Sequence, residues 1–187
     1  MVAAKSGLYE FQDGEFIKCY NRNNSPFLSC VNDDNYILVS DLMYDKEGTL
    51  WVFNSSVENC FWTLDKNQQW KSLDVCSQIK YNDDLRCLFF SRTNNKMWFL
   101  SNYWQTSQLY AYDYIKNTLH TYGPTYINED GVQITPNFFY KIKEDREGNI
   151  WMCTSSGPLY LSADNIRLGA QEVTCLLYTS PSPRDCS

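Results

Sequence analysis

The sequence predicts an all-β chain, an incomplete β-propeller of about three four-stranded blades. A turn followed by a tryptophan-bearing strand occurs at residues 45–53 and 144–154, with a weaker copy at residues 91–99. The three tryptophans lie 47 and then 53 residues apart, close to the period of about 40 to 50 residues that is typical of propeller blades. Aromatic residues make up 16% of the chain, which favours many short, closely packed strands.

The turn before each tryptophan has one position of special backbone geometry. Three residues before the tryptophan stand Gly48, Asn95 and Gly148. Glycine adopts a positive φ freely, and asparagine tolerates it better than most other residues. We therefore expect a tight hairpin turn at all three places, and such a turn explains the repeat without any ligand.

The tryptophan-bearing strands are apolar on both faces. In the strand at residues 50–54, Leu50 and Val52 face one side, whereas Trp51 and Phe53 face the other. This pattern predicts a sheet covered on both sides, as a blade between two neighbours is, and it disfavours a two-layer sandwich with one wet face. Propellers usually have 4 to 8 four-stranded blades, so about three blades do not close a ring.

Taken in order, the chain gives four groups of strands, each expected to be a blade or part of one. Residues 1–20 form the end of a blade, in which strands at 8–11 and 15–18 are joined by the hairpin signal Gln12-Asp13-Gly14. Residues 21–36 are rich in Asn, Asp and Ser and form a crossover loop. No segment shows a sustained helical period. The other three groups, at 37–74, 84–123 and 138–174, hold strands at 37–43, 50–54, 60–65 and 70–74, at 85–90, 97–101, 109–114 and 119–122, and at 138–143, 150–154 and 159–161.

Both ends of the chain are unusual for a propeller. Met1 to Gly7 has the same spacing as Trp151 to Gly157, so residues 1–9 align with residues 151–159. We therefore expect that the chain begins inside a blade and is a fragment of a longer protein. Residues 175–187 resemble translated adapter sequence at the ends of unrelated metagenomic reading frames, so we expect a non-native tail there and a partial propeller over residues 1–174.

Charge and composition exclude several classes of partner. The net charge is −6 without any basic cluster, which argues against nucleic acid and anionic membrane surfaces. No run approaches 18 apolar residues, so no membrane span is expected in this fragment. The N-terminus lacks the order of a signal peptide, which for a fragment says nothing about location. The eight cysteines contain no C-x-x-C pair and assign neither a zinc site nor a disulfide: Cys19, Cys30, Cys60, Cys76, Cys87, Cys153, Cys175 and Cys186.

The sequence shows no catalytic, cofactor or metal motif, so we expect a protein that is not an enzyme. His120, the only histidine, alternates with Thr118 and Tyr122 and is expected to be a half-exposed surface side chain. There is no G-x-S-x-G elbow and no Gly-rich phosphate loop. Three acidic pairs would suit calcium or glycosidase chemistry, but turn formation is the favoured interpretation: Asp33-Asp34, Asp83-Asp84 and Glu129-Asp130.

One loop carries the candidate ligand or partner contact. Residues 101–107 include two adjacent aromatic residues, Tyr103 and Trp104, outside the predicted strand pattern. Large aromatic side chains on a loop stack on sugars or anchor a protein partner. The alternative, which is slightly favoured, is that Trp104 folds back over the edge of a blade.

Beyond these motifs, the chain resembles a known family. The units at residues 45–51 and 144–151 resemble the two-component-regulator propeller repeat of large extracytoplasmic proteins of Bacteroidota. In the middle unit, Arg92 and Asn95 replace the Asp and Gly of the other two. Over residues 1–174 the chain is also similar to the PorZ-like surface propellers of the type IX secretion system, at residues 6–11, 13–14, 20, 24–26, 128–131 and 157–161.

The resemblance implies a location at the outer-membrane surface or in the periplasm. It also implies a longer protein with two propellers and a C-terminal sorting domain. Members of the family act in an attachment complex with a sortase and other proteins, and they bind anionic lipopolysaccharide for linkage to secreted cargo. The resemblance places this lipopolysaccharide binding on no particular residue of the chain.

Two functions from different classes remain open. The first is a non-enzymatic scaffold, whose rigid blades present loops to protein partners and to a glycolipid or glycan. The second is the periplasmic ligand-sensing propeller of a hybrid two-component histidine kinase, in which glycan binding shifts a dimer equilibrium. A propeller lyase or glycosidase is a further alternative, because propellers host many functions and the fold alone does not choose.

Overall fold

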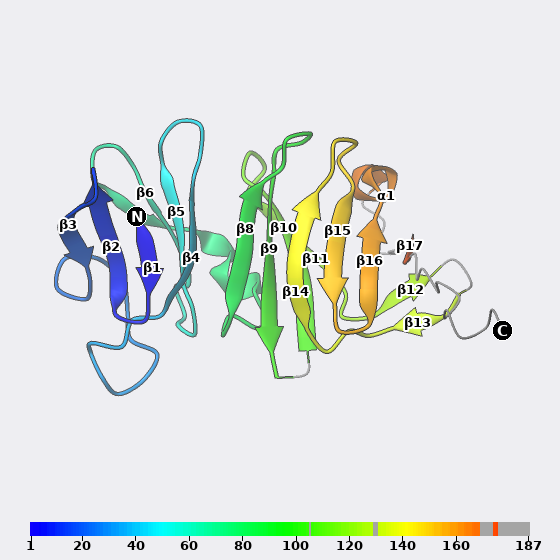
Figure 1. Cartoon of the computed structure of the whole chain (residues 1–187), viewed down its shortest axis with the longest axis horizontal. Helices are drawn as coiled ribbons and strands as arrows, with labels where there is room; N and C mark the ends of the chain where they lie inside the picture. Colours follow the sequence, from blue (N-terminus) through cyan, green and yellow to red (C-terminus); the bar gives the residue numbers. More distant parts are fainter. Residues whose placement is uncertain (105, 129–130, 169–173, 176–187) are drawn as a thin grey trace.

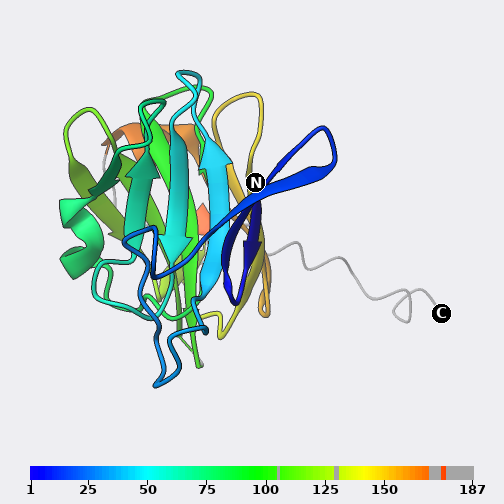
Figure 2. The same cartoon turned by 90° about the vertical axis from the view of Figure 1, so that its left-hand side faces the viewer.

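A computed structural model describes residues 1–104, 106–128, 131–168 and 174–175 of the chain. Four antiparallel sheets stand side by side along the long axis of the molecule (Figure 1). Viewed from the N-terminal end, they lie one behind another (Figure 2). This arrangement confirms the predicted all-β class and the incomplete propeller, and we number the sheets blades 1 to 4.

Blades 2 and 3 have four strands each, and blades 1 and 4 have three. Within every blade, strands that follow one another in sequence are neighbours in the sheet. Blade 1 contains β1 (Val2–Ala4), β2 (Gly7–Gln12) and β3 (Glu15–Tyr20), and blade 2 contains β4 (Val39–Tyr44), β5 (Leu50–Asn54), β6 (Phe61–Leu64) and β7 (Trp70–Ser72). Blade 3 contains β8 (Leu85–Phe90), β9 (Lys96–Tyr103), β10 (Thr106–Asp113) and β11 (Thr118–Tyr122), and blade 4 contains β14 (Phe139–Glu144), β15 (Ile150–Thr154) and β16 (Gly157–Leu161).

Blade 1 repeats the register of blade 4. In blade 1, Ala4 pairs with Gly7 and Val2 pairs with Tyr9. In blade 4, Thr154 pairs with Gly157 and Met152 pairs with Leu159. The alignment of residues 1–9 with residues 151–159 is therefore confirmed, strand for strand.

Three apolar clusters fill the spaces between neighbouring blades. Leu50 and Val52 lie between blades 1 and 2 with Leu8 and Tyr20. On the other face of the same strand, Phe53 lies in the cluster between blades 2 and 3 and Trp51 packs against it. The third cluster joins blade 3 to blade 4 and includes Trp98. The prediction that these sheets are covered on both faces is confirmed for blades 2 and 3.

The end blades are covered on one face only. In β15, buried residues alternate with exposed ones, and the Trp151 side chain on the outward face is 43% exposed. Phe16 and Ile17 of β3 are exposed at the other end of the stack. Such alternation is the pattern of a sheet with one face in water.

Blades 2 and 4 build the turn before the tryptophan in the same way. In blade 4, Asp145 accepts hydrogen bonds from the backbone N–H of Asn149 (2.9 Å) and from Nε1 of Trp151 (2.8 Å). In blade 2, Asp45 accepts the same two bonds from Thr49 and Trp51, both at 2.8 Å. Each carboxylate thus ties its own turn to the indole of the strand that follows.

The glycines of these turns have the predicted backbone. Gly48 has a φ of 82° and Gly148 a φ of 88°. An added Cβ at Gly148 would lie 2.6 Å from Oγ1 of Thr93 in the neighbouring blade. Asn95 does not have a positive φ, so that prediction was wrong. The reason is that the turn of blade 3 is one residue longer, because Phe90 pairs with Met97.

The turn of blade 3 takes its carboxylate from blade 4. Glu144, at the end of β14, is almost fully buried and accepts hydrogen bonds from Oγ of Ser91 (2.5 Å), N–H of Arg92 (2.7 Å) and Oγ1 of Thr93 (2.8 Å). At the start of β14, the backbone of Phe139 is bonded to the side chain of Asn102 in β9. The N–H of Phe139 donates to Oδ1 of Asn102, and Nδ2 of Asn102 donates to the carbonyl of Phe139, both at 3.1 Å. Both ends of β14 are therefore bonded to blade 3.

Five short elements were not predicted. Two are helices, the 3₁₀ helix η1 (Asp74–Gln78) and α1 (Ala163–Leu168), which are too short to show a helical period. The predicted strand at residues 70–74 ends at Ser72, because η1 begins at Asp74. The other three form a small sheet: β12 (Tyr126–Asn128), β13 (Gln133–Ile134) and β17 (Thr174–Cys175). Residues 176–187 of the expected tail lie outside the described residues.

Candidate functional site

Two features stand out at opposite ends of the blades. The first is the hairpin between β9 and β10, at the lower end of blade 3 in Figure 1. The second is a cleft at the other end, between the turns of blade 3 and α1. Because antiparallel strands alternate in direction, the turn between the second and third strands lies at the same end as the crossover to the next blade.

The hairpin tip consists of Tyr103 and Trp104. Tyr103 is the last residue of β9 and pairs with Thr106, so the predicted loop at residues 101–107 is mostly strand. This corrects the expectation that both aromatic residues lie outside the strand pattern. The pairing continues to the tip because side chains on both strands near it are buried: Ser101, Asn102, Ser107 and Gln108.

Trp104 points into solvent. Its side chain is 85% exposed, and its φ of 48° is that of a residue in a tight turn. The expectation that Trp104 folds back over a blade edge is therefore wrong. The ring of Trp104 meets that of Tyr103 edge-on, with centroids 6.3 Å apart and an angle of 88° between the planes.

A third aromatic residue supports the hairpin tip from the crossover between blades 2 and 3. Tyr81 stacks on Tyr103, with centroids 5.2 Å apart and the planes at 9°. Nζ of Lys80 lies 5.0 Å from the centre of the Tyr81 ring. No sequence pattern predicts this contact, because Tyr81 lies in the crossover before blade 3 and Tyr103 lies at the end of the second strand of that blade.

The hairpin tip offers apolar ring faces, an indole N–H and a nearby ammonium group. Apolar ring faces stack on the C–H faces of sugars, and an exposed tryptophan fills a pocket on a protein partner. The stack of Tyr81 on Tyr103 restrains one side chain before any ligand arrives, which lowers the entropy lost on binding. The arrangement can hold a ligand.

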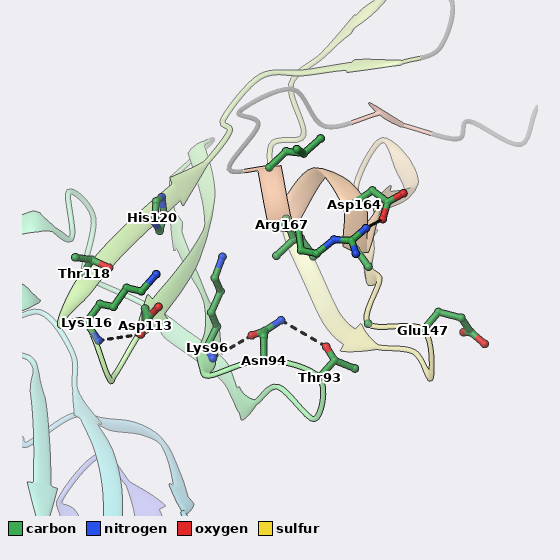
Figure 3. A pocket seen from close by; sticks show the side chains of 14 residues that line it. Thr93, Asn94, Lys96, Asp113, Lys116, Thr118, His120, Glu147, Asp164 and Arg167 are labelled. Atoms are coloured by element: carbon green, nitrogen blue, oxygen red, sulfur yellow. Dashed lines mark hydrogen bonds and ion pairs between the residues drawn. The ribbon is translucent and has the colours of Figure 1, made fainter.

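The cleft at the other end of the blades has a volume of about 600 Å³ (Figure 3). It lies between the turns of blade 3, the turn before β15, and α1. Figure 3 shows Lys96 and Lys116 on the side of blade 3, facing Arg167 of α1. Such a volume suits a small ligand, but the cleft is open and no buried polar side chain points into it among the residues described.

Charges of both signs line this cleft. Burial of Lys96 lowers its pKa, Asp113 opposes that change, and Lys116 adds to it. Asp113 is also engaged by its own turn, because it accepts the N–H groups of Ile115 (3.1 Å) and Lys116 (2.9 Å). Arg167 forms an ion pair with Asp164. Among the described residues, cations and carboxylates line the cleft in equal number, so neither sign of charge is in excess: Lys96, Lys116 and Arg167, with Asp113, Glu147 and Asp164.

The other sequence-predicted residues lie apart from one another. His120 is an exposed side chain on β11 at the edge of the cleft (Figure 3), in line with the predicted surface position. Asp33 accepts a turn hydrogen bond from the N–H of Asn35 (2.9 Å), as expected. Asp84 forms an ion pair with Arg86. The pair at residues 129–130 lies outside the described residues.

Neither metal sites nor membrane spans are found in the described part of the chain. No group of three or more His, Cys, Asp or Glu side chains there is placed to hold a metal ion. None of the helices described has the length and apolar character that crossing a bilayer demands.

Comparisons with known proteins agree with this architecture. Residues 133–156, which include the turn and tryptophan strand of blade 4, match the family model "Two component regulator propeller". No curated protein sequence gives a significant match.

Two solved structures show the fold. PorZ, described as an essential bacterial surface component of the type IX secretion system of Porphyromonas gingivalis, matches 92% of this chain with a TM-score of 0.75 and 18% identity. The extracellular domain of a hybrid two-component system protein of B. thetaiotaomicron matches 68% of the chain with a TM-score of 0.50 and 21% identity.

The chain spans about a quarter of the length of PorZ (24%) and 17% of the second protein. At these identities, the likeness shows the fold. The chain therefore carries a two-component-regulator propeller repeat in an open propeller fold, similar to that of a secretion-system surface protein and to that of the extracellular domain of a two-component protein.

Proposed function

We propose that the chain is part of a non-enzymatic cell-surface scaffold in the attachment complex of a type IX secretion system. The observation that supports this most is the match to PorZ over 92% of the chain. In this proposal, residues 1–174 are the partial propeller and residues 175–187 are a non-native tail. The location is extracytoplasmic, at the outer-membrane surface or in the periplasm.

The mechanism of such a scaffold is positioning. The blades are packed on one another through three apolar clusters and hold the hairpin tip at a fixed place. Tyr103 and Trp104 would contact the sortase, another protein of the complex, or an anionic lipopolysaccharide that is delivered to the sortase. The chain would break no bond itself.

Binding experiments test this proposal. The purified chain is presented to immobilised anionic lipopolysaccharide, to neutral lipopolysaccharide, and to the sortase of a type IX system. We expect binding to the sortase or to the anionic glycolipid, and a loss of about tenfold or more for Trp104→Ala, because a central aromatic anchor contributes at least about 1.4 kcal/mol.

Ile115→Ala is the matched control, since Ile115 is also an exposed apolar side chain of blade 3 but lies in the turn at the opposite end. Unchanged binding by Trp104→Ala, together with lowered stability, would remove the hairpin tip from the proposal. If the unchanged chain binds neither the sortase nor the anionic glycolipid, the scaffold proposal is contradicted.

The sensor propeller of a hybrid two-component histidine kinase is the second candidate. It is supported by the family-model match and by the likeness to an extracellular two-component domain. A sensor would bind a soluble glycan and leave the sortase unbound. The same experiment, extended to a panel of soluble oligosaccharides, separates the two candidates.

A further inference from the structure

The crossover from blade 2 to blade 3 holds two buried cysteines at one place. Cys60 immediately precedes β6, and Cys76 lies in η1, after the last strand of blade 2. The Cys60 side chain is 0% exposed and that of Cys76 is 6% exposed. Both belong to the apolar cluster between blades 2 and 3.

Hydrogen bonds fix the position of the Cys76 sulfur beside Cys60. The N–H of Phe61 donates to Sγ of Cys76 at 3.3 Å, and this nitrogen follows directly after the carbonyl carbon of Cys60. By bond geometry, the Cys76 sulfur therefore lies within about 6 Å of the Cα of Cys60. In the structure both residues are free, buried cysteines of the same apolar cluster.

We infer that Cys60 and Cys76 form a disulfide bond that fixes the crossover between blades 2 and 3. Two buried thiols held this close together, one of them bonded to the backbone N–H that follows the other residue, need little movement to reach disulfide geometry. Whether the bond forms in the cell rests on the extracytoplasmic location of the proposed function, because disulfides persist in oxidising compartments.

The reaction balances as a thiol–disulfide exchange. The two thiols release two protons and two electrons and form one S–S bond, while a disulfide of an oxidoreductase or of oxidised glutathione takes up the electrons and becomes two thiols. The neighbouring Cys60 side chain lowers the pKa of Cys76, and burial opposes that change. Because both sulfurs are buried in the folded chain, the reaction takes place in the course of folding.

The bond would also order the candidate site. The N–H of Ile79 donates to the carbonyl of Cys76 at 3.1 Å, and Lys80 and Tyr81 follow directly. Anchoring η1 thus fixes the segment from which Tyr81 stacks on Tyr103. In blade 3, Gln108 occupies the strand position that corresponds to Cys60, so the bond is specific to the crossover that supports the hairpin tip.

Peptide mapping of the full chain tests the inference. The chain is refolded in a buffer of oxidised and reduced glutathione, alkylated under denaturing conditions without reduction, and digested. We expect one cross-linked product joining the peptides of Cys60 and Cys76, lighter by two hydrogen atoms than their sum. Recovery of both peptides in alkylated form would overturn the inference.

Thermal unfolding supplies a second measurement. Closing the loop between the two cysteines should raise the Tm of the oxidised chain by about 5 to 10 °C over that of the reduced chain. The difference should vanish in Cys60→Ser and persist in Cys30→Ser, whose thiol lies in the crossover between blades 1 and 2. An equal Tm for the oxidised and reduced chains would contradict the inference.

The outcome is independent of the proposed function. Because the oxidant is supplied in the buffer, a cross-link without sortase or glycolipid binding leaves the disulfide standing and removes the scaffold. Sortase or glycolipid binding by a chain that forms no cross-link supports the scaffold and contradicts the disulfide.

Discussion

The turns of blades 3 and 4 are both held by a carboxylate, but the carboxylate comes from a different place in each. In blade 4 the carboxylate of Asp145 belongs to the turn itself and binds the indole of Trp151. In blade 3 no acidic residue occupies that place, and the turn is held by Glu144 of the neighbouring blade. Trp98, the counterpart of Trp151, is fully buried, and its Nε1 has no hydrogen-bond partner among the residues described.

The position of the carboxylate decides whether its hydrogen bonds stabilise one blade or couple two blades. A carboxylate inside a turn stabilises that turn alone, whereas a carboxylate donated by a neighbour stabilises the junction. The loss of the turn aspartate in blade 3 therefore does not mark a degenerate repeat. It marks a place where two blades depend on one another.

The largest effect should come from removing the shared carboxylate. Glu144→Ala removes a buried carboxylate that accepts charge-assisted hydrogen bonds from Ser91, Arg92 and Thr93, so we expect the free energy of unfolding to fall by about 3 kcal/mol. Denaturant titration measures this change. Glu147→Ala, at an exposed glutamate in the next turn, serves as the control and should change stability by less than about 0.5 kcal/mol. An effect of that small size for Glu144→Ala would refute the coupling between blades.

Restoring an acidic residue to the turn of blade 3 sharpens the comparison. Ser91→Asp places a second carboxylate where Oγ of Ser91 now donates to Glu144, so we expect destabilisation by about 2 kcal/mol from like-charge repulsion. In a Glu144→Gln background the same change should be close to neutral, since an amide can donate to the new carboxylate. A double-mutant cycle measures the difference. Equal effects in both backgrounds would show that the two positions are not coupled.

The two turn aspartates should behave alike. Asp45→Ala and Asp145→Ala each remove a turn hydrogen bond and an indole hydrogen bond, both partly exposed, so we expect a loss of about 1 kcal/mol in each case. Thermal unfolding of the two variants checks the expectation. A much larger effect for either variant would mean that its turn also joins blades.

The smallest effect is a dependence on pH that arises from Asp145 in the turn of blade 4. Burial raises the pKa of Asp145, but hydrogen bonds from Asn149, Trp151 and the Glu147 backbone outweigh it and lower the pKa to about 2. Because this value lies below that of an unfolded aspartate, about 3.9, the stabilisation is present above pH 4 and is lost as the pH falls toward 2.

The stability difference between the unchanged chain and Asp145→Asn should therefore shrink between pH 4 and pH 2. Thermal melts of both proteins at several pH values measure the difference. A difference that stays constant over this range would contradict the lowered pKa.

Much of the fold follows from the sequence because blades are local structures. The turn glycines, the alternation of residues and the tryptophan period depend on neighbours in the chain, and the strands they predict are present in blades 2, 3 and 4. Gly48 and Gly148 have the expected positive φ, whereas Asn95 does not, because one extra residue changed its turn.

Only part of the candidate site could be predicted from the sequence. Tyr103 and Trp104 attract attention as adjacent aromatic residues, but their exposure depends on how far two strands pair, which no local pattern sets. Tyr81, Glu144 and the partnership of Cys60 with Cys76 depend on contacts across or around a blade boundary. A single sequence records the residues of such contacts and not their pairing.

The anchoring of β14 at both ends has a mechanical consequence. A strand held only at one end acts as a hinge, but β14 is bonded to blade 3 through Asn102 at its start and through Glu144 at its end. These bonds oppose shear and twist between the two blades, so we expect blades 3 and 4 to move together. We therefore expect a pull by a partner on Trp104 to be transmitted into blade 4.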